Sequence, residues 1–256
     1  MNFDEKKITK ELLIWLKNWF LENGKDCNAI IGISGGKDST ITAALCAKAL
    51  GNKRVIGVLM PNGEQKDISD SKRVCELLDI QSITINIKDI VNDEIKVLLK
   101  AINELGKNEL SNQTIINLPP RIRMATLYAI SQSMNGRVIN TCNLSEDWIG
   151  YSTRYGDSAG DVSPLANFTV NEVRKIGIEL GLPRDLVYKI PSDGLCGMTD
   201  EDNLGFTYET LDKYIRTGIC DNREIQTLID KKHLQNKFKL EPMPSYKYGK
   251  ILAKVR

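Results

Sequence analysis

Hydrophobic and polar positions recur along the chain with two different periods, and the period predicts the type of each element. In the first twenty residues, Ile8, Leu12, Trp15, Leu16 and Trp19 recur at helical spacing. This pattern predicts an amphipathic helix whose apolar stripe packs on the body of the protein. Acidic residues stand among the bases of this segment, so we expect a mature helix rather than a signal peptide.

Short β-branched runs then alternate with helical stretches. We expect strands at residues 28–33, 54–60 and 82–87, and helices at residues 39–50, 67–78 and 90–105. Strands separated by helices require right-handed crossovers and therefore a parallel sheet. The predicted fold class is α/β, a Rossmann-like doubly wound parallel sheet with helices on both faces.

The second half of the chain continues the alternation less regularly. Pro119 and Pro120 mark the expected start of another helix, and a strand at 137–141 follows it. The stretch 143–166 is rich in Gly, Ser and Asp, and long irregular connections of this kind are usually functional or mobile. Further helices are expected at 170–180, 207–217 and 222–235. No repeat or linker divides the chain, so we expect one domain over residues 1–256.

Composition narrows the possible partners. The chain has 256 residues, of which 41% are hydrophobic and 27% charged, as in ordinary globular proteins. Lys and Arg number 35 against 33 Asp and Glu, so no global field favours nucleic acid or an anionic membrane, and we expect neither as a partner. No apolar run reaches the roughly 18 residues of a membrane span, which favours a cytoplasmic protein. The six cysteines are scattered without a CxxC pair, so we expect reduced, structural thiols.

A candidate phosphate loop lies where the first strand passes into a helix. The sequence SGGKDS runs from Ser34 to Ser39, where the first N–H groups of the helix lack intrahelical partners and suit an anion. Two glycines allow close approach of a phosphate chain, and both serine hydroxyls can donate to it. Asp38 can bind magnesium, and Lys37 adds a further phosphate partner. Neither the Walker A spacing nor GxGxxG is present.

SGGxDS after a first strand resembles the signature of the ATP pyrophosphatase, or PP-loop, superfamily, whose fold is adenine nucleotide alpha-hydrolase-like. Its members cleave ATP between the α and β phosphates and commonly adenylate a substrate. The resemblance implies an ATP site made in part by Gly32, Ile33, Ser34, Gly35, Gly36, Lys37, Asp38 and Ser39.

Later motifs resemble one family of this superfamily, the ammonia-dependent NAD synthetases. The matching segments are RIRM with LY at 121–128, TCNLSE at 141–146, GYSTRYGD at 150–157, PSDGL at 191–195 and TDExxLGxxY at 199–208. Their order and spacing make the match more specific than the phosphate loop alone.

The resemblance implies roles for particular residues. Asp38 and Glu146 would be catalytic and hold Mg²⁺ on the ATP phosphates, while Thr141 and Ser192 would contact ATP. The implied deamido-NAD ligands are Arg121, Arg154, Asp161, Asn236 and Lys237. A carboxylate, Asp161 or Asp157, would accept a proton from the attacking ammonia. The family also implies a homodimer whose interface contributes to the dinucleotide site.

The implied reaction activates the carboxylate of deamido-NAD as an acyl-adenylate with loss of pyrophosphate, after which ammonia displaces AMP. No protein nucleophile is required, and the single histidine, His233, is expected at the surface. A glutaminase would need a second domain beyond these 256 residues, so free ammonia is the expected donor.

Departures from the family pattern lie on the ligand side. Val170 stands where the family has an ATP-binding lysine, which Lys175 could replace, and Arg154 and Asn236 stand for a usual Lys and His. Two alternatives therefore remain open: a paralogous PP-loop amide ligase acting on another carboxylic acid, and a nucleotide-binding regulatory protein that has lost catalysis. Enzymes of tRNA sulfuration or lysidine formation usually carry catalytic cysteines or a basic extension, which are not visible here.

Overall fold

Among the residues that the structure describes, a four-stranded parallel sheet forms the centre of the protein. The structure, a computed structural model, describes residues 3–65, 68–189 and 200–246. The strands are β1 Asn28–Gly32, β2 Val55–Leu59, β3 Gln81–Thr84 and β4 Gly136–Val138, in the order β3-β2-β1-β4. The chain therefore adds β2 and β3 on one side of β1 and later adds β4 on the other side. The carboxyl ends of β1 and β4 flank this switch point, where ligands bind in open α/β sheets.

Helices alternate with these strands, as the sequence predicts. They are α1 Glu5–Asn23, α2 Lys37–Leu50, α3 Ile68–Leu77, α4 Lys88–Asn103, α5 Asn112–Ser133, α6 Leu144–Trp148, α7 Val170–Glu179, α8 Arg184–Val187, α9 Asp200–Leu204, α10 Tyr208–Thr217 and α11 Arg223–Asn236. Short 3-10 turns lie at η1 Asn52–Arg54 and η2 Lys237–Lys239. None of the helices in the described ranges is long and apolar enough to cross a membrane.

Both faces of the sheet are covered, which confirms the doubly wound prediction. Successive residues of β1 point to opposite faces, because side chains alternate along a strand. Ala29 and Ile31 pack in a cluster with α1, α2 and α7, whereas Ile30 packs with Met124 and Leu127 of α5. A third, smaller cluster joins α6, α7, α10 and α11 beside the sheet.

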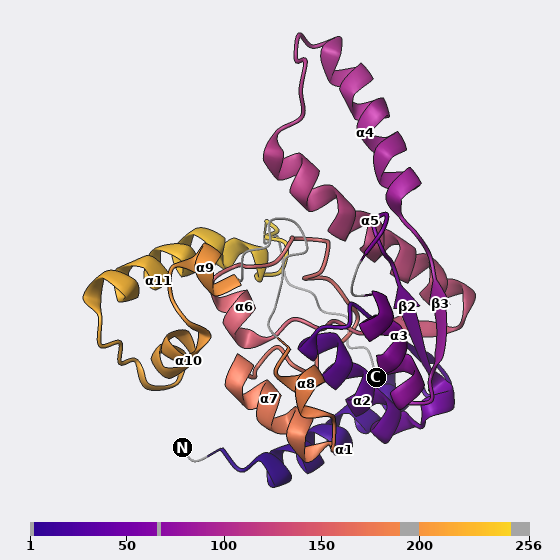
Figure 1. Ribbon diagram of the computed structural model, residues 1–256, viewed down its shortest axis with the longest axis vertical. Helices are drawn as coiled ribbons and strands as arrows, with labels where there is room; N and C mark the ends of the chain where they lie inside the picture. Colours follow the sequence, from indigo (N-terminus) through magenta and orange to yellow (C-terminus); the bar gives the residue numbers. More distant parts are fainter. Residues whose placement is uncertain (1–2, 66–67, 190–199, 247–256) are drawn as a thin grey trace.

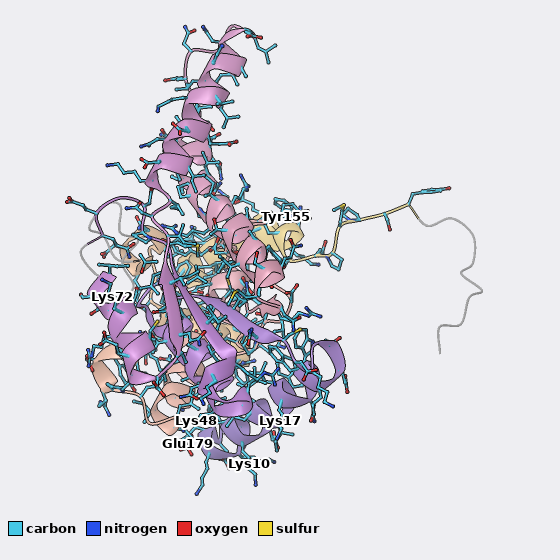
Figure 2. The ribbon with its side chains drawn as sticks, turned by 90° about the vertical axis from the view of Figure 1, so that its right-hand side faces the viewer. Lys10, Lys17, Lys48, Lys72, Tyr155 and Glu179 are labelled. Atoms are coloured by element: carbon cyan, nitrogen blue, oxygen red, sulfur yellow. The ribbon has the colours of Figure 1, made fainter. Side chains whose placement is uncertain are left out.

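The buried face of α1 differs from the predicted stripe. Leu12, Leu16 and Phe20 recur every fourth residue and are buried, whereas Trp15 is 45% exposed. Lys10 and Lys17 extend from α1 into solvent (Figure 2). The prediction that Trp15 packs on the body was wrong. The buried face is centred on Leu12, Leu16 and Phe20, and Trp15 lies at the edge of that face.

Helix α5 begins earlier than its prolines suggested. Ser111 caps it, since its hydroxyl accepts a hydrogen bond from Thr114 N at 3.2 Å, and Pro119 and Pro120 lie inside the helix. Proline removes the hydrogen bond to the carbonyl four residues earlier, but Ile115 and Ile116 are exposed, so water can solvate their carbonyls. The predicted start at the prolines was therefore wrong. The early part of α5 projects with α4 from the body (Figure 1).

The stretch 143–166 is more ordered than its composition indicates. It contains α6. A parallel bridge also pairs Val162 of this stretch with Ile139, the residue that follows β4. This bridge holds the connection against the carboxyl edge of the sheet.

Candidate active site

The loop after β1 has the backbone geometry of a preformed anion site. Gly35 has φ +77°, and a Cβ there would lie 2.9 Å from Ser71 N, so glycine is required for both conformation and space. Ser34 Oγ lies 3.1 Å from Ser39 Oγ and accepts a hydrogen bond from Gly36 N at 3.2 Å. These contacts order the loop before a phosphate arrives.

The two acids expected to hold magnesium converge beside this loop. Asp38 stands in the first turn of α2 and Glu146 in the first turn of α6. Lys37 Nζ lies 2.6 Å from Asp38 Oδ2 and 3.6 Å from Glu146 Oε1. The ammonium of Lys37 thus lies within 4 Å of a carboxylate oxygen from each acid. Both carboxylates remain partly accessible, with side-chain exposures of 17% and 16%.

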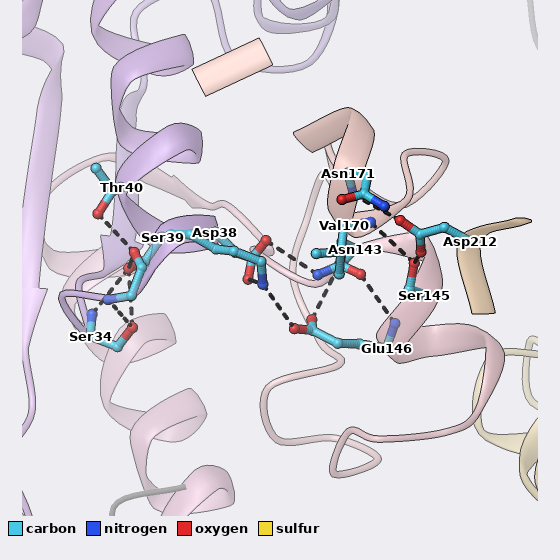
Figure 3. A network of polar contacts seen from close by, with 12 residues as sticks. Ser34, Asp38, Ser39, Thr40, Asn143, Ser145, Glu146, Val170, Asn171 and Asp212 are labelled. Carbon is cyan, nitrogen blue, oxygen red and sulfur yellow. Dashed lines mark hydrogen bonds and ion pairs between the residues drawn. The ribbon is translucent and has the colours of Figure 1, made fainter. Parts of the chain in front are cut away.

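Asn143 connects these two acids. Its side-chain oxygen accepts from Glu146 N at 3.1 Å, and Glu146 Oε2 accepts from Asn143 N at 3.4 Å, which is a reciprocal capping box at the start of α6. Asn143 Nδ2 also donates to Asp38 Oδ1 at 3.2 Å (Figure 3). Asn143 is fully buried, so its side chain fixes the distance between α2 and α6.

A buried polar chain supports α6 from behind. Ser145 Oγ donates to Asp212 Oδ1 at 2.5 Å and accepts from Val170 N at 3.1 Å, while Asp212 Oδ2 accepts from Asn171 N at 2.8 Å (Figure 3). Burial raises the pKa of Asp212, and these hydrogen bonds act in the opposite direction. The network fixes α6 to α7 and α10.

Helix α7 carries two cations about one turn after Val170, Arg174 and Lys175. Val170 is fully buried, and the ammonium of Lys175 lies 5.7 Å from the ring of Phe3, so Lys175 contacts the segment that leads into α1. Arg174 lies one turn after Val170. The pKa of Lys37 is raised above its ordinary value: burial lowers it, the charges of Asp38 and Glu146 together raise it more, and the charge of Arg174 lowers it by a smaller amount. Arg174 Nε is buried and has no hydrogen-bond partner within the described residues. Sequence reasoning missed Arg174, although its i+4 spacing from Val170 was a usable signal.

The other described residues that we expect to contact nucleotide lie at the sheet edge. Gly32 ends β1, and Ile33 is buried and donates its N–H to Val58 O at 3.0 Å. Thr141 is half-buried just after the strand β4. Ser192 lies outside the described residues.

Two of the expected dinucleotide residues meet on the loop after α6. Arg121 Nε donates to Arg154 O at 3.3 Å. The guanidinium of Arg154 lies 5.0 Å from the ring centre of Tyr155 and 5.3 Å from that of Phe238. Two cationic side chains and two aromatic rings therefore share one surface.

The two expected ligands near the carboxyl end make different contacts. Asn236 Nδ2 donates to Ile149 O at 3.2 Å and to Lys232 O at 2.9 Å, and its side chain fills the space above Gly150. Lys237 is exposed and lies 3.5 Å from Glu241. The structure brings neither side chain to Arg121 or Arg154 by a described contact.

Asp161 borders a cavity of about 470 Å³ on the carboxyl side of the sheet. Its carboxylate accepts from Val138 N at 2.7 Å and from Tyr128 Oη at 3.4 Å. The polar lining comprises Asn140, Asp147, Ser158, Asp161, Ser163 and Lys239. Asp161 therefore joins the end of β4 to this cavity.

Asp147 and Lys239 were not predicted. Burial, and then the charge of Asp157, raise the pKa of Asp147 to about 6. Lys239 Nζ donates to Gly150 O at 2.9 Å and Ser152 O at 3.3 Å, so it ties the carboxyl-terminal segment to the loop. No sequence motif marks either residue.

His233 is half-buried rather than at the surface as expected. Its ring stacks on Trp148 at 4.1 Å, and Nδ1 lies 2.8 Å from Trp148 O. The polar sequence of α11 does not predict this contact, because the apolar partner, Trp148, belongs to α6.

The acids fit a nucleotide-bound magnesium ion. Within residues 3–65, 68–189 and 200–246, no group of three or more Asp, Glu, His or Cys side chains could hold a metal alone. Magnesium usually binds through one or two carboxylates together with substrate phosphates and water. Asp38 and Glu146 both contact the ammonium of Lys37 beside the phosphate loop, so their two carboxylates lie close enough to supply that donor set.

Known proteins match this chain along most of its length. The family described as NAD synthase matches residues 8–246. An NH(3)-dependent NAD(+) synthetase from Pyrococcus furiosus is 40% identical over 216 residues, which cover 84% of this chain and 78% of that protein. The enzyme of the same name from Finegoldia magna is 33% identical over 246 residues, covering 95% and 97%.

A solved structure shows the same architecture. The structure of NMN synthetase from Francisella tularensis superposes with a TM-score of 0.84 at 29% identity, covering 96% of this chain and 100% of that one. The matched residues 8–246 include the phosphate loop and all four strands described above. The chain belongs to the NAD synthase family.

Proposed function

We propose that this chain is an ammonia-dependent NAD synthetase, which converts deamido-NAD, ATP and ammonia into NAD, AMP and pyrophosphate. One observation carries the proposal. In a member of this family, the carboxylates of Asp38 and Glu146 converge on the ammonium of Lys37 beside the loop of Ser34 to Ser39. Membership gives the reaction class, and the two acids give the means of handling the triphosphate.

The first half of the reaction transfers the adenylyl group. A carboxylate oxygen of deamido-NAD attacks the α-phosphorus of ATP, and the bond from that phosphorus to the bridging oxygen breaks to release pyrophosphate. The loop amides and the hydroxyls of Ser34 and Ser39 bind the departing phosphates. Magnesium held by Asp38 and Glu146 would neutralise phosphate charge. Positioning the reactants in line is the main remaining task of the protein.

The second half forms the amide. Ammonia attacks the acyl carbon, AMP leaves with its electron pair, and the nitrogen loses a proton. Asp161, which lies on the cavity, and Asp157 remain the proposed acceptors. Thr141, Ser192, Arg121, Arg154, Asn236 and Lys237 remain the proposed contacts to ATP and the dinucleotide.

Nicotinate mononucleotide is a second candidate acid. The solved structure with a TM-score of 0.84 is described as an NMN synthetase, and the departures at Val170 and Asn236 lie on the ligand side. The test supplies purified chain, MgATP and ammonium with each acid in turn. A higher kcat/KM for deamido-NAD supports the proposal, and a higher value for nicotinate mononucleotide supports the second candidate.

The same assay addresses the remaining alternatives. A regulatory protein without catalysis would bind ATP but release no AMP with either acid. A paralogous ligase would release AMP only with another carboxylic acid. Free ammonia is the proposed donor, so glutamine alone should not replace ammonium.

We also propose a homodimer and a cytoplasmic location, where ATP is supplied. The hairpin of α4 and early α5 projects from the body (Figure 1) and exposes apolar side chains. These are Ile90, Val97, Leu105, Ile115 and Ile116. A second copy covering them would explain their exposure in one chain, and sedimentation of the protein at micromolar concentration in the analytical ultracentrifuge tests this.

A further inference from the structure

The ammonium of Lys37 is buried in a site built for a cation. The side chain of Lys37 is 2% exposed, and Nζ contacts Asp38 and Glu146 from two different helices. The ring of Tyr208, on a third helix, lies 5.9 Å from the ammonium. Three elements therefore surround one positive charge.

Here Lys37 pairs with the two acids, and its expected contact with the ATP phosphates stays a prediction. Burying an ammonium is unfavourable unless opposite charges compensate it, and here the two acids provide that compensation. The same two carboxylates are the proposed magnesium ligands. A metal ion bound by both acids would lie within a few ångströms of Lys37, and like charges at that distance repel strongly in a partly buried site.

We propose that Lys37 is a resident counter-ion that occupies the cation position between Asp38 and Glu146 until nucleotide binds, and thereby suppresses metal binding to the empty site. The proposal rests on the proposed function, because it takes these acids as the magnesium site. When a triphosphate arrives, its negative charge offers Lys37 a new partner next to the loop. Metal and nucleotide then enter together, which keeps the acids paired at every stage.

The nearby charges favour this exchange. Arg174 acts on Lys37 with like charge, whereas Asp38 and Glu146 act with opposite charge. The anionic nucleotide therefore adds compensation at the place where two cations, from α2 and α7, lie near each other. Asn143 holds Asp38 Oδ1 from the other side, so the carboxylate keeps its place when the ammonium leaves.

The test is a Mn²⁺ titration of the full chain without nucleotide, followed by electron paramagnetic resonance of the free ion. Lys37→Met removes the charge and keeps most of the length of the side chain. Lys37→Gln is a second variant that can still donate to the acids if the methionine variant folds poorly. Lys48→Met, on the same helix but at the surface (Figure 2), is the matched control. Circular dichroism checks that each variant is folded.

We expect Lys37→Met and Lys37→Gln to bind Mn²⁺ at least about tenfold more tightly than the wild type, and Lys48→Met to match the wild type. Equal affinity in all four proteins, whether weak or strong, would overturn the proposal. The titration contains neither acid substrate nor ammonia. A chain that fails to make NAD would therefore refute the proposed function without changing how this result is judged.

Discussion

Asn143 Nδ2 donates a hydrogen bond to Asp38 Oδ1 at 3.2 Å, while the oxygen of the same amide caps α6. One buried side chain thus satisfies a helix terminus and orients a carboxylate that belongs to another helix. The capping box and the proposed magnesium site are parts of one structure.

The first prediction concerns this dual role. Asn143→Ala should lower the free energy of unfolding by about 1 to 2 kcal/mol through loss of the cap and of a buried hydrogen bond. It should also reduce kcat at least about tenfold, because Asp38 loses its orienting donor. Urea unfolding and an AMP-release assay measure the two effects.

The matched control is Ser111→Ala, which removes the cap of α5. Its stability loss should be similar, with kcat within about twofold of the wild type. If the two variants lost activity equally, Asn143 would have only a structural role.

The second prediction separates Glu146 from an ordinary capping glutamate. Glu146→Gln should reduce AMP formation by roughly 100-fold or more, the usual effect of removing one electrostatic contact to the reacting charge. Glu172 occupies the equivalent capping-box position of α7, where it pairs with Arg216, so Glu172→Gln is the control. Steady-state rates at saturating MgATP decide between them, and a similar loss in both variants would contradict the proposed metal role.

The sequence was most informative where one local pattern dictates both structure and chemistry. A β-branched strand, two glycines and a helix start predicted the phosphate loop, and Gly35 indeed has the left-handed backbone that the loop requires. Glu146 could be matched with Asp38 only through the family resemblance, since nothing in their own spacing indicates contact.

The sequence was less informative where contacts between distant segments decide how a side chain or helix is placed. The direction of the Lys37 side chain depends on Glu146, which belongs to a distant segment, so the sequence did not indicate the ion pairs that the structure shows, and the phosphate contact of Lys37 stays a prediction. The solvent exposure around Ile115 and Ile116 allows α5 to pass through two prolines. His233 is held by Trp148, which its own helix does not reveal.

The third prediction uses the buried acid Asp147. Its pKa is raised from 3.8 to about 6 in the folded protein, so the folded state binds the proton more strongly than the unfolded state. The resulting stabilisation is complete below about pH 4 and is lost as the pH rises through 6. Asp147→Asn should therefore raise the free energy of unfolding by about 2 to 3 kcal/mol at pH 8 and by only about 0.5 kcal/mol at pH 4. Urea titrations without Mg²⁺ at both pH values test this, and an equal effect at the two would contradict it.

The fourth prediction concerns the contact of Asn236 with Gly150. A Cβ at Gly150 would lie 2.0 Å from Asn236 Cβ, and φ there is +67°. Gly181 has φ +82°, and a Cβ there would meet no atom within 4 Å, so it isolates the backbone effect. Gly181→Ala should cost about 1 kcal/mol and Gly150→Ala at least about 3 kcal/mol. Thermal unfolding compares them, and equal losses would show that Asn236 yields without cost.

The most direct test of the proposed reaction follows an oxygen atom. Deamido-NAD labelled with ¹⁸O in its carboxylate is incubated with the chain, MgATP and ammonium, and the products are examined by mass spectrometry. The acyl-adenylate route predicts one labelled oxygen in each AMP formed, with one NAD made for each AMP. Label in phosphate or pyrophosphate, or NAD formed with unlabelled AMP, would contradict it.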